Sequence, residues 1–232
     1  MSSRPSSRPI TRKKCSLPSS TIMTSDKTVH VLPCRGELRA SIILLHGYSS
    51  HASAHRDDGI SFVSDGIEVV IPDAPGHGHR DDGRLAQIAL LPDKPRLDAI
   101  HDIAREWIDE LPSLFAKCQR HGSSRIGLVG VSMGGFAALG ALTPRCPFTA
   151  IAAVLAAPAF VDPTTITPGE PPVLIGLAGR DTAVPPGPGR QFACDYGAEL
   201  HEYPESEHCM RGEDWNDLWG RTAAFLRRHL NA

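Results

Sequence analysis

The sequence contains one serine whose neighbours suit it to nucleophilic chemistry. Ser132 lies in the motif Gly130-x-Ser132-x-Gly134, between an apolar run at residues 126–129 and small residues that continue to Leu142. The pattern predicts a buried strand, a one-residue corner and a helix, which is the context in which the motif indicates a nucleophile elbow. A residue at so sharp a corner takes a strained backbone conformation, and the chain folds back only if positions 130 and 134 carry no Cβ atom. We therefore expect the Ser132 hydroxyl to be exposed above a helix N-terminus, where negative charge is favoured.

A serine hydroxyl is a poor nucleophile unless a base lies within hydrogen-bond reach and a third group orients that base. Asp181 and His208 are candidates for these two tasks, because both follow predicted strands. Two rivals are Asp162, which also follows a predicted strand, and His201, which lies inside one. Without such partners, Ser132 would be an ordinary N-cap of the helix that follows a buried strand.

The elements that must position these residues follow from the hydrophobic pattern. Apolar runs alternate with helical patterns, which predicts an α/β fold with a mostly parallel sheet and helices on both faces. Strands are expected at residues 28–33, 40–45, 68–71, 126–129, 150–157, 173–178 and 199–203, and helices at residues 55–64, 97–119, 133–142, 191–196 and 215–230. Pro112 is expected to kink or break the second of these helices. In such sheets ligands bind beyond the C-terminal strand ends, where the candidate site residues lie.

Five motifs, in this order along the chain, resemble those of α/β-hydrolases, close to the small esterases and the dienelactone-hydrolase-like members. They are His46-Gly47-Tyr48, Pro72-Asp-Ala-Pro-Gly76-His77-Gly78, the Gly130-to-Gly135 elbow, Gly179-Arg-Asp181 and Glu207-His208. The resemblance covers about residues 38–230. It implies an α/β-hydrolase fold with a minimal cap domain or none.

The resemblance also implies a role for each matching residue. Ser132 would be the nucleophile, His208 the general base, and Asp181 the acid that orients the His208 imidazole, in the chain order expected of the family. The backbone N–H groups of Tyr48 and Met133 would form the oxyanion hole. No cofactor and no metal are implied.

Four further residues near these motifs call for an interpretation. His77 and His79 lie two residues apart, which suggests a metal site, but no Cys, Asp or Glu at ligand spacing completes it and a loop role is favoured. His46 is expected to be a structural hydrogen-bonding residue. Cys209, next to His208, is interpreted as a small apolar filler and not as a second nucleophile.

The composition argues against several classes of function. The formal net charge of -2 argues against nucleic acid or an anionic membrane as the main partner. No run of about eighteen apolar residues occurs, so no membrane span is expected. The six cysteines are scattered without a C-x-x-C motif, which fits reduced thiols in the cytoplasm better than a disulfide framework or a zinc site. We expect a cytoplasmic monomer or homodimer that acts on a small-molecule acyl substrate.

Residues 1–25 differ in composition from the rest of the chain. They are rich in Ser, Pro, Arg and Lys and contain no acidic residue. They lack the apolar core of a secretory signal and are predicted to be a disordered N-terminal extension, with Met23 as an alternative start. Residues 26–232 are predicted to form a single α/β-hydrolase domain of ordinary size.

Loop lengths bear on the substrate. Residues 160–172 are too few for the helical cap that many α/β-hydrolases insert there, and residues 81–95 would make only a small lid or loop. An open site favours small ester or lactone substrates, so the leading hypothesis is a carboxylesterase-like serine hydrolase. The alternatives are a serine peptidase resembling the catalytic domains of prolyl oligopeptidases, and a non-hydrolytic ligand-binding protein on the same scaffold.

Overall fold

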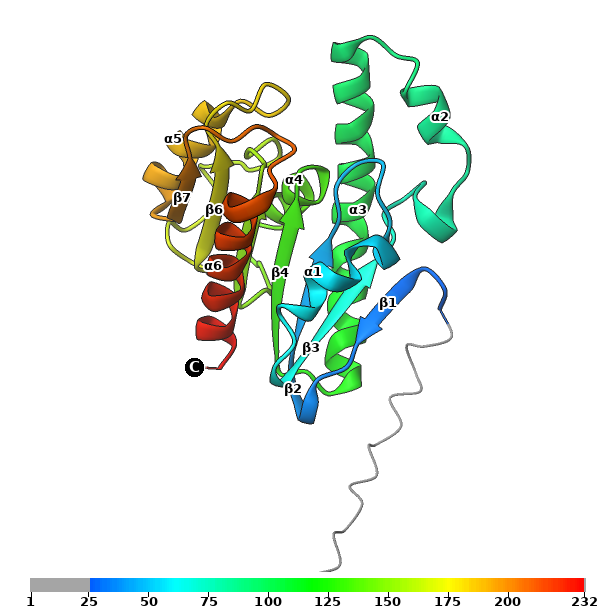
Figure 1. Cartoon of the computed structure of the whole chain (residues 1–232). Helices are drawn as coiled ribbons and strands as arrows, with labels where there is room; N and C mark the ends of the chain where they lie inside the picture. The colour runs from blue at the N-terminus through cyan, green and yellow to red at the C-terminus, as the bar shows by residue number, and fades with distance from the viewer. Residues whose placement is uncertain (1–25, 232) are drawn as a thin grey trace, which may run out of the picture.

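The computed structural model describes residues 26–231 and has a seven-stranded sheet at its centre (Figure 1). In the strand order β1-β3-β2-β4-β5-β6-β7, β1 is antiparallel to β3 and the other neighbours are parallel. The strands are Val29–Leu32 (β1), Arg35–Leu45 (β2), Asp65–Pro72 (β3), Arg125–Val131 (β4), Ala150–Val154 (β5), Val173–Ala178 (β6) and Glu199–Tyr203 (β7). The predicted mostly parallel sheet is confirmed, and the residues predicted at its edge form the antiparallel strand β1.

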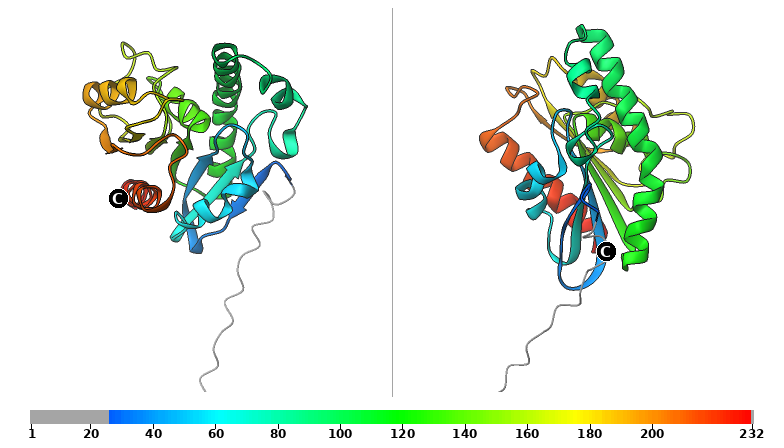
Figure 2. Two further views of the ribbon diagram at one scale, coloured as in Figure 1. Left: turned by 45° about the horizontal axis from the view of Figure 1, so that its top comes forward. Right: turned by 90° about the vertical axis from the view of Figure 1, so that its right-hand side faces the viewer.

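Helices cover both faces of this sheet. They are the 3-10 turns Ala52–His55 (η1) and Gly78–Arg80 (η2) and the helices Arg56–Ile60 (α1), Arg84–Ile88 (α2), Asp93–His121 (α3), Met133–Gly140 (α4), Pro186–Tyr196 (α5) and Gly212–Leu230 (α6). Helices α3, α4 and α5 pack on one face and α1 and α6 lie on the other, as the edge-on view in Figure 2 shows. Strands β4, β5 and β6 lie between these layers, which is why they are almost entirely apolar.

Helix α3 is longer than the sequence predicts. It runs without a break over 29 residues that include Pro112, so the proline does not end it. Pro112 is exposed, whereas its neighbours Leu111 and Leu114 are buried against the sheet. Water can therefore solvate the carbonyl group that loses its partner at the proline, while packing of the opposite side holds the helix together.

Two other helices differ from the predicted boundaries by four residues or more. The helix expected at residues 55–64 is a 3-10 turn followed by the five-residue α1. The helix expected at residues 191–196 begins earlier, at Pro186. Proline suits the first turn of a helix, because the N–H that it lacks would have no partner there.

The extension predicted at residues 1–25 lies outside the part of the chain that the structure describes. The proposed single domain over residues 26–232 stays a prediction. Among residues 26–231, no helix is both long enough and apolar enough to cross a bilayer.

The C-terminal ends of the parallel strands meet at one edge of the sheet, at the top of Figure 1. Helix α2 and the N-terminal part of α3 extend beyond this edge (Figures 1 and 2). The connection between β5 and β6, residues 155–172, contains no helix. One small helical protrusion therefore stands beside the loops at this edge, and within the described residues no cap helix is inserted between β5 and β6.

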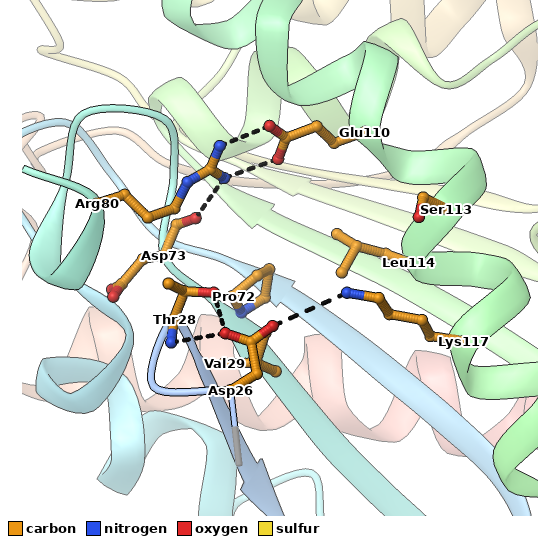
Figure 3. A pocket seen from close by; sticks show the side chains of 10 residues that line it. All are labelled: Asp26, Thr28, Val29, Pro72, Asp73, Arg80, Glu110, Ser113, Leu114 and Lys117. Atoms are coloured by element: carbon orange, nitrogen blue, oxygen red, sulfur yellow. Dashed lines mark hydrogen bonds and ion pairs between the residues drawn. The ribbon is translucent and has the colours of Figure 1, made fainter. Parts of the chain in front are cut away.

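Two arginines tie the segment after β3 to α3. Arg80 donates to both carboxylate oxygens of Glu110, at 2.7 and 2.6 Å, and to the Asp73 carbonyl oxygen at 3.1 Å (Figure 3). Arg84 binds both oxygens of Glu106, one helical turn earlier on α3. The bidentate pair of Arg80 with Glu110 fixes orientation as well as distance, so this segment is anchored on a rigid helix.

Candidate active site

Ser132 lies at a sharp corner between β4 and α4. Its backbone has φ 54° and ψ -114°, a conformation that L-residues rarely adopt and that persists only where the surroundings enforce it. The Ser132 N–H donates to the Val154 carbonyl oxygen of β5 at 2.8 Å, and the Ser132 carbonyl oxygen accepts the Phe136 N–H at 3.0 Å. The chain therefore changes from a buried strand to a helix within one residue.

Gly130 and Gly134 flank this corner, and no larger residue fits at either position. A Cβ atom on Gly130 would lie 2.0 Å from the Gly134 carbonyl oxygen, and one on Gly134 would lie 2.3 Å from the Leu45 carbonyl oxygen. Both contacts are with backbone atoms, which cannot rotate away as a side chain can. The two glycines therefore allow β2, β4 and α4 to approach one another closely.

We expect Gly134→Ala to lower the free energy of unfolding by about 3 kcal/mol, because backbone must shift to admit the methyl group. Gly220→Ala is the matched control: Gly220 lies inside α6, where a Cβ atom meets nothing within 4 Å. That change should stabilise the protein by about 0.5–1 kcal/mol. Urea titrations followed by circular dichroism measure both effects. A Gly134→Ala variant as stable as the wild type would contradict the close packing at the corner.

Ser132, His208 and Asp181 come together at the upper edge of the sheet. The Ser132 Oγ lies 2.9 Å from His208 Nε2, and His208 Nδ1 lies 2.7 Å from Asp181 Oδ2. The Asp181 side chain is 2% exposed and the His208 side chain 26% exposed. This arrangement can pass a proton from the hydroxyl to the imidazole while a buried carboxylate faces the developing positive charge.

The second oxygen of Asp181 is held by the backbone. Asp181 Oδ1 accepts the N–H groups of Ala183 and Val184, at 2.9 and 2.8 Å. These two donors were not predicted from the sequence, although an aspartate that begins a turn commonly accepts the N–H two residues later. The carboxylate is thereby oriented with one oxygen toward the backbone and the other toward His208.

The rival candidates lie in other surroundings. The exposed Asp162 accepts the backbone N–H and the hydroxyl of Thr164, and His201 pairs with Glu199 in β7. Cys209 is exposed, so it does not act as the small apolar filler that the sequence predicts. The residue lies in the loop between β7 and α6, where the side chain faces solvent and not the core.

Two backbone N–H groups lie on the segments that meet at Ser132. Met133 is the first residue of α4, and Tyr48 follows the end of β2. A Cβ atom on Gly47 would lie 3.7 Å from the Ser132 Cβ, so the Tyr48 segment passes directly beside the corner. Within the described residues, neither the Tyr48 N–H nor the Met133 N–H donates to another protein group. Both remain free to bind an oxygen atom held near Ser132.

Comparison with known proteins identifies the family of the chain. A model of the family described as "Alpha/beta hydrolase family" matches residues 42–231. The chain belongs to the α/β-hydrolase family. It is similar to Esterase YjfP of Escherichia coli K12, with 29% identity over 119 residues, which make up 50% of this chain and 41% of that protein. The matches to curated relatives span less than half of those proteins' lengths.

Solved structures share the fold of this α/β-hydrolase. Esterase PE8 has a TM-score of 0.64 and 24% identity, over 87% of this chain and 98% of that one. The protein TT1662 of Thermus thermophilus has a TM-score of 0.66 and 17% identity, over 88% of this chain and 94% of that one. The predicted α/β-hydrolase fold is therefore confirmed.

His46 is a buried, neutral residue beneath the Tyr48 segment of this α/β-hydrolase. Its Nδ1 donates to the Gly47 carbonyl oxygen at 2.9 Å, and its Nε2 accepts the Ala74 N–H at 3.1 Å. A ring nitrogen that accepts a hydrogen bond carries no proton, so these contacts require the neutral imidazole. Burial accordingly lowers the pKa of His46 from 6.5 to about 4.

We expect acid to destabilise the protein through His46. Its pKa is lower in the folded state than in the unfolded chain, so the unfolded chain binds more protons as the pH falls. The contribution of neutral His46 to the free energy of unfolding is complete above pH 6.5 and is lost as the pH falls from 6.5 to 4. This contribution amounts to about 3 kcal/mol. Denaturant titrations across that range measure how steeply the free energy of unfolding depends on pH, and this slope should be smaller in His46→Asn. An unchanged slope in the variant would argue against this origin.

The two histidines after β3 have different surroundings. His77 is buried, whereas the His79 side chain is 60% exposed. His77 Nδ1 donates to the Pro75 carbonyl oxygen at 2.9 Å, and His77 Nε2 accepts the Ser49 N–H at 3.3 Å. Over residues 26–231, no cluster of three or more His, Cys, Asp or Glu side chains is arranged to hold a metal ion. Both ring nitrogens of His77 are instead engaged with the backbone of two loops.

Proposed function

We propose that this α/β-hydrolase is a carboxylesterase-like serine hydrolase that cleaves small ester or lactone substrates through an acyl-enzyme on Ser132. The observation that carries the proposal is the continuous hydrogen-bond path from Ser132 through His208 to Asp181. The two free backbone N–H groups beside Ser132 add the second element that acyl transfer needs. The similarity to proteins named as esterases agrees with this proposal.

Acylation would proceed by general base catalysis. His208 Nε2 takes the proton from the Ser132 Oγ as that oxygen attacks the ester carbonyl carbon, and Asp181 stabilises the imidazolium that forms. The Tyr48 and Met133 N–H groups bind the negative oxygen of the tetrahedral intermediate, and each such donor contributes about 3–4 kcal/mol. When the intermediate collapses, the leaving oxygen takes the proton from His208 and departs as an alcohol, which leaves the acyl group on Ser132.

Deacylation would repeat these steps with water. His208 removes a proton from a water molecule, whose oxygen attacks the acyl carbonyl carbon. The same two N–H groups bind the second tetrahedral intermediate. The Ser132 Oγ then leaves and recovers the proton from His208, and the carboxylic acid is released. For a lactone, alcohol and acid belong to one molecule, so the product is a hydroxy acid.

The surroundings of the site favour small or accessible esters. No helix is inserted between β5 and β6, and His208 keeps a quarter of its side chain exposed. Helix α2 and the start of α3 extend above the sheet edge on one side of it (Figure 1). Such a site can admit a substrate without the opening of a large cap.

Labelling and a substrate panel test the proposal together. We expect a fluorophosphonate to modify the protein once, on the peptide that contains Ser132, and short-chain p-nitrophenyl esters to be hydrolysed faster than long-chain ones. Thioesters, lactones and aminoacyl-prolyl amides in the same panel separate an esterase from a peptidase. Labelling of a different residue, or binding of the esters without turnover, would reject the serine-esterase assignment.

A further inference from the structure

The direction of the Tyr48 N–H is set by groups outside the proposed triad. A trans peptide is planar, so this N–H points opposite to the carbonyl group of Gly47. The Gly47 carbonyl oxygen accepts the His46 Nδ1–H at 2.9 Å and the Ser50 N–H at 3.3 Å. Because that oxygen is held from two sides, the peptide plane before Tyr48 has little freedom to rotate.

The peptide after Tyr48 is held by His77. The Ser49 N–H donates to His77 Nε2 at 3.3 Å. Ser49 has a φ of 62°, in the left-handed region that a non-glycine residue adopts only when its neighbours impose it. The rings of Tyr48 and His77 also meet edge to face, with centroids 5.8 Å apart. His77 therefore contacts both the side chain of Tyr48 and the backbone that follows it.

His77 is fixed in turn by the loop after β3. Its Nδ1 donates to the Pro75 carbonyl oxygen at 2.9 Å. The buried Asp73 joins the same two loops at a second point, because it accepts the N–H groups of Ala52 and His79, at 2.7 and 2.9 Å. Arg80 then holds this loop to Glu110 on α3 (Figure 3). A continuous series of contacts thus leads from a rigid helix to Tyr48.

We propose that His77 is a positioning residue of the oxyanion hole, whose neutral imidazole keeps the Tyr48 N–H directed at the reacting carbonyl. The inference rests on the proposed function, because it assumes that Tyr48 binds the oxyanion. Misplacement of a catalytic group by about 1 Å can lower the rate about 100-fold. His77 needs no contact with the substrate to have such an effect.

The hydrogen bonds of His77 define its protonation state. Nδ1 carries the proton that Pro75 accepts, so Nε2 must offer its lone pair to the Ser49 N–H. A proton on Nε2 would make Nε2 a donor facing the Ser49 N–H, which is also a donor, so the hydrogen bond between them would break. Burial is the main cause that lowers the pKa of His77, which keeps the ring neutral at ordinary pH.

The charged and titratable groups around His77 come from three segments. They are Asp73, His79 and Asp81 on its own loop, Arg84 on α2, and His46 and Tyr48 on the segment after β2. Asp73 and Asp81 favour the charged ring, whereas Arg84 opposes it. Desolvation outweighs the effect of the aspartates on the pKa of His77. The ring therefore takes up a proton only at a pH below the ordinary range of a histidine pKa.

Two substitutions separate the contacts of His77. In His77→Asn the amide nitrogen can replace Nδ1 and donate to Pro75, but nothing reaches the Ser49 N–H. In His77→Gln the longer side chain can place its carbonyl oxygen near the position of Nε2 and accept that N–H. We expect His77→Asn to lower kcat about 10- to 100-fold with little change in KM. His77→Gln should recover most of the loss, and the exposed control His79→Asn should remain close to wild type.

Inhibition by an aryl boronic acid distinguishes a positioning role of His77 from a purely structural one. Its tetrahedral adduct on Ser132 places an oxygen in the oxyanion hole, so its inhibition constant should rise in His77→Asn by the factor by which kcat/KM falls. Protonation of His77 should break its hydrogen bond with the Ser49 N–H, so kcat/KM of the wild type should fall further at acid pH than kcat/KM of His77→Gln, whose side chain does not titrate. Thermal unfolding of the variants shows whether the fold is retained.

The outcomes distinguish this inference from the function on which it rests. Full activity and full boronic acid affinity in His77→Asn would overturn the positioning role alone. An equal loss in His79→Asn and His77→Asn would also overturn it, because the effect would then be a general disturbance of the loop. A wild-type protein that neither hydrolyses esters nor binds the boronic acid would reject the proposed function together with this inference.

Discussion

Ser132→Ala and His208→Ala are each expected to lower kcat for p-nitrophenyl acetate by about 10⁶-fold, and the double variant to lower it no further. The reason is that the hydroxyl and the imidazole, 2.9 Å apart, act as one unit. Without the base, the hydroxyl is a poor nucleophile, and without the hydroxyl, no acyl-enzyme can form. The activity that remains would come from the oxyanion hole and from binding.

Turnover rates of the two single variants and the double variant check this prediction, with thermal unfolding to show that each variant is folded. Ser53→Ala is a suitable control, because Ser53 is an exposed serine on the η1 turn. Its activity should equal that of the wild type. Additive losses in the double variant would mean that Ser132 and His208 act independently, which would contradict the proposed proton transfer.

The parts of the site that arise from local sequence could be predicted. The corner at Ser132 depends on an apolar strand before it and on glycines two residues away on either side, and all of these lie within one short stretch. The positions of Asp181 and His208 follow from the strands that precede them, since parallel strands end at the same edge of the sheet. Periodicity and turn chemistry predict the corner and the common strand edge, whereas the choice of Asp181 and His208 over their rivals depends on the resemblance to α/β-hydrolases.

The contacts between distant segments could not be predicted in the same way. Asp73 reaches Ala52 and His77 reaches Ser49 across 21 and 28 positions in the chain, and no periodic pattern marks such pairs. The continuity of α3 through Pro112 has the same origin, because burial of one side of the helix outweighs the local effect of the proline. Tertiary packing decides these features, and a single sequence does not display it.

Asp181→Asn is expected to lower kcat/KM by about 10⁴-fold while the fold is retained. Asp181 Oδ1 accepts two backbone N–H groups, those of Ala183 and Val184. Asparagine has a single carbonyl oxygen, and these two donors will hold it, so the amide NH₂ group must face His208 Nδ1. His208 Nδ1 then has to accept a hydrogen bond, and the ring proton moves to Nε2. That atom is the one that must take the proton from Ser132, so the imidazole is held in the tautomer that cannot act as a base.

Kinetics and the tautomer itself can be measured on the same variant. The ¹⁵N spectrum of labelled histidine should show the His208 proton on Nδ1 in the wild type and on Nε2 in Asp181→Asn, together with the loss of kcat/KM. Asp162→Asn is the matched control, because Asp162 is the rival acid and lies exposed in the loop after β5. It should keep full activity. If Asp162→Asn loses activity and Asp181→Asn does not, the acid has been assigned to the wrong strand end, although the roles of Ser132 and His208 would stand.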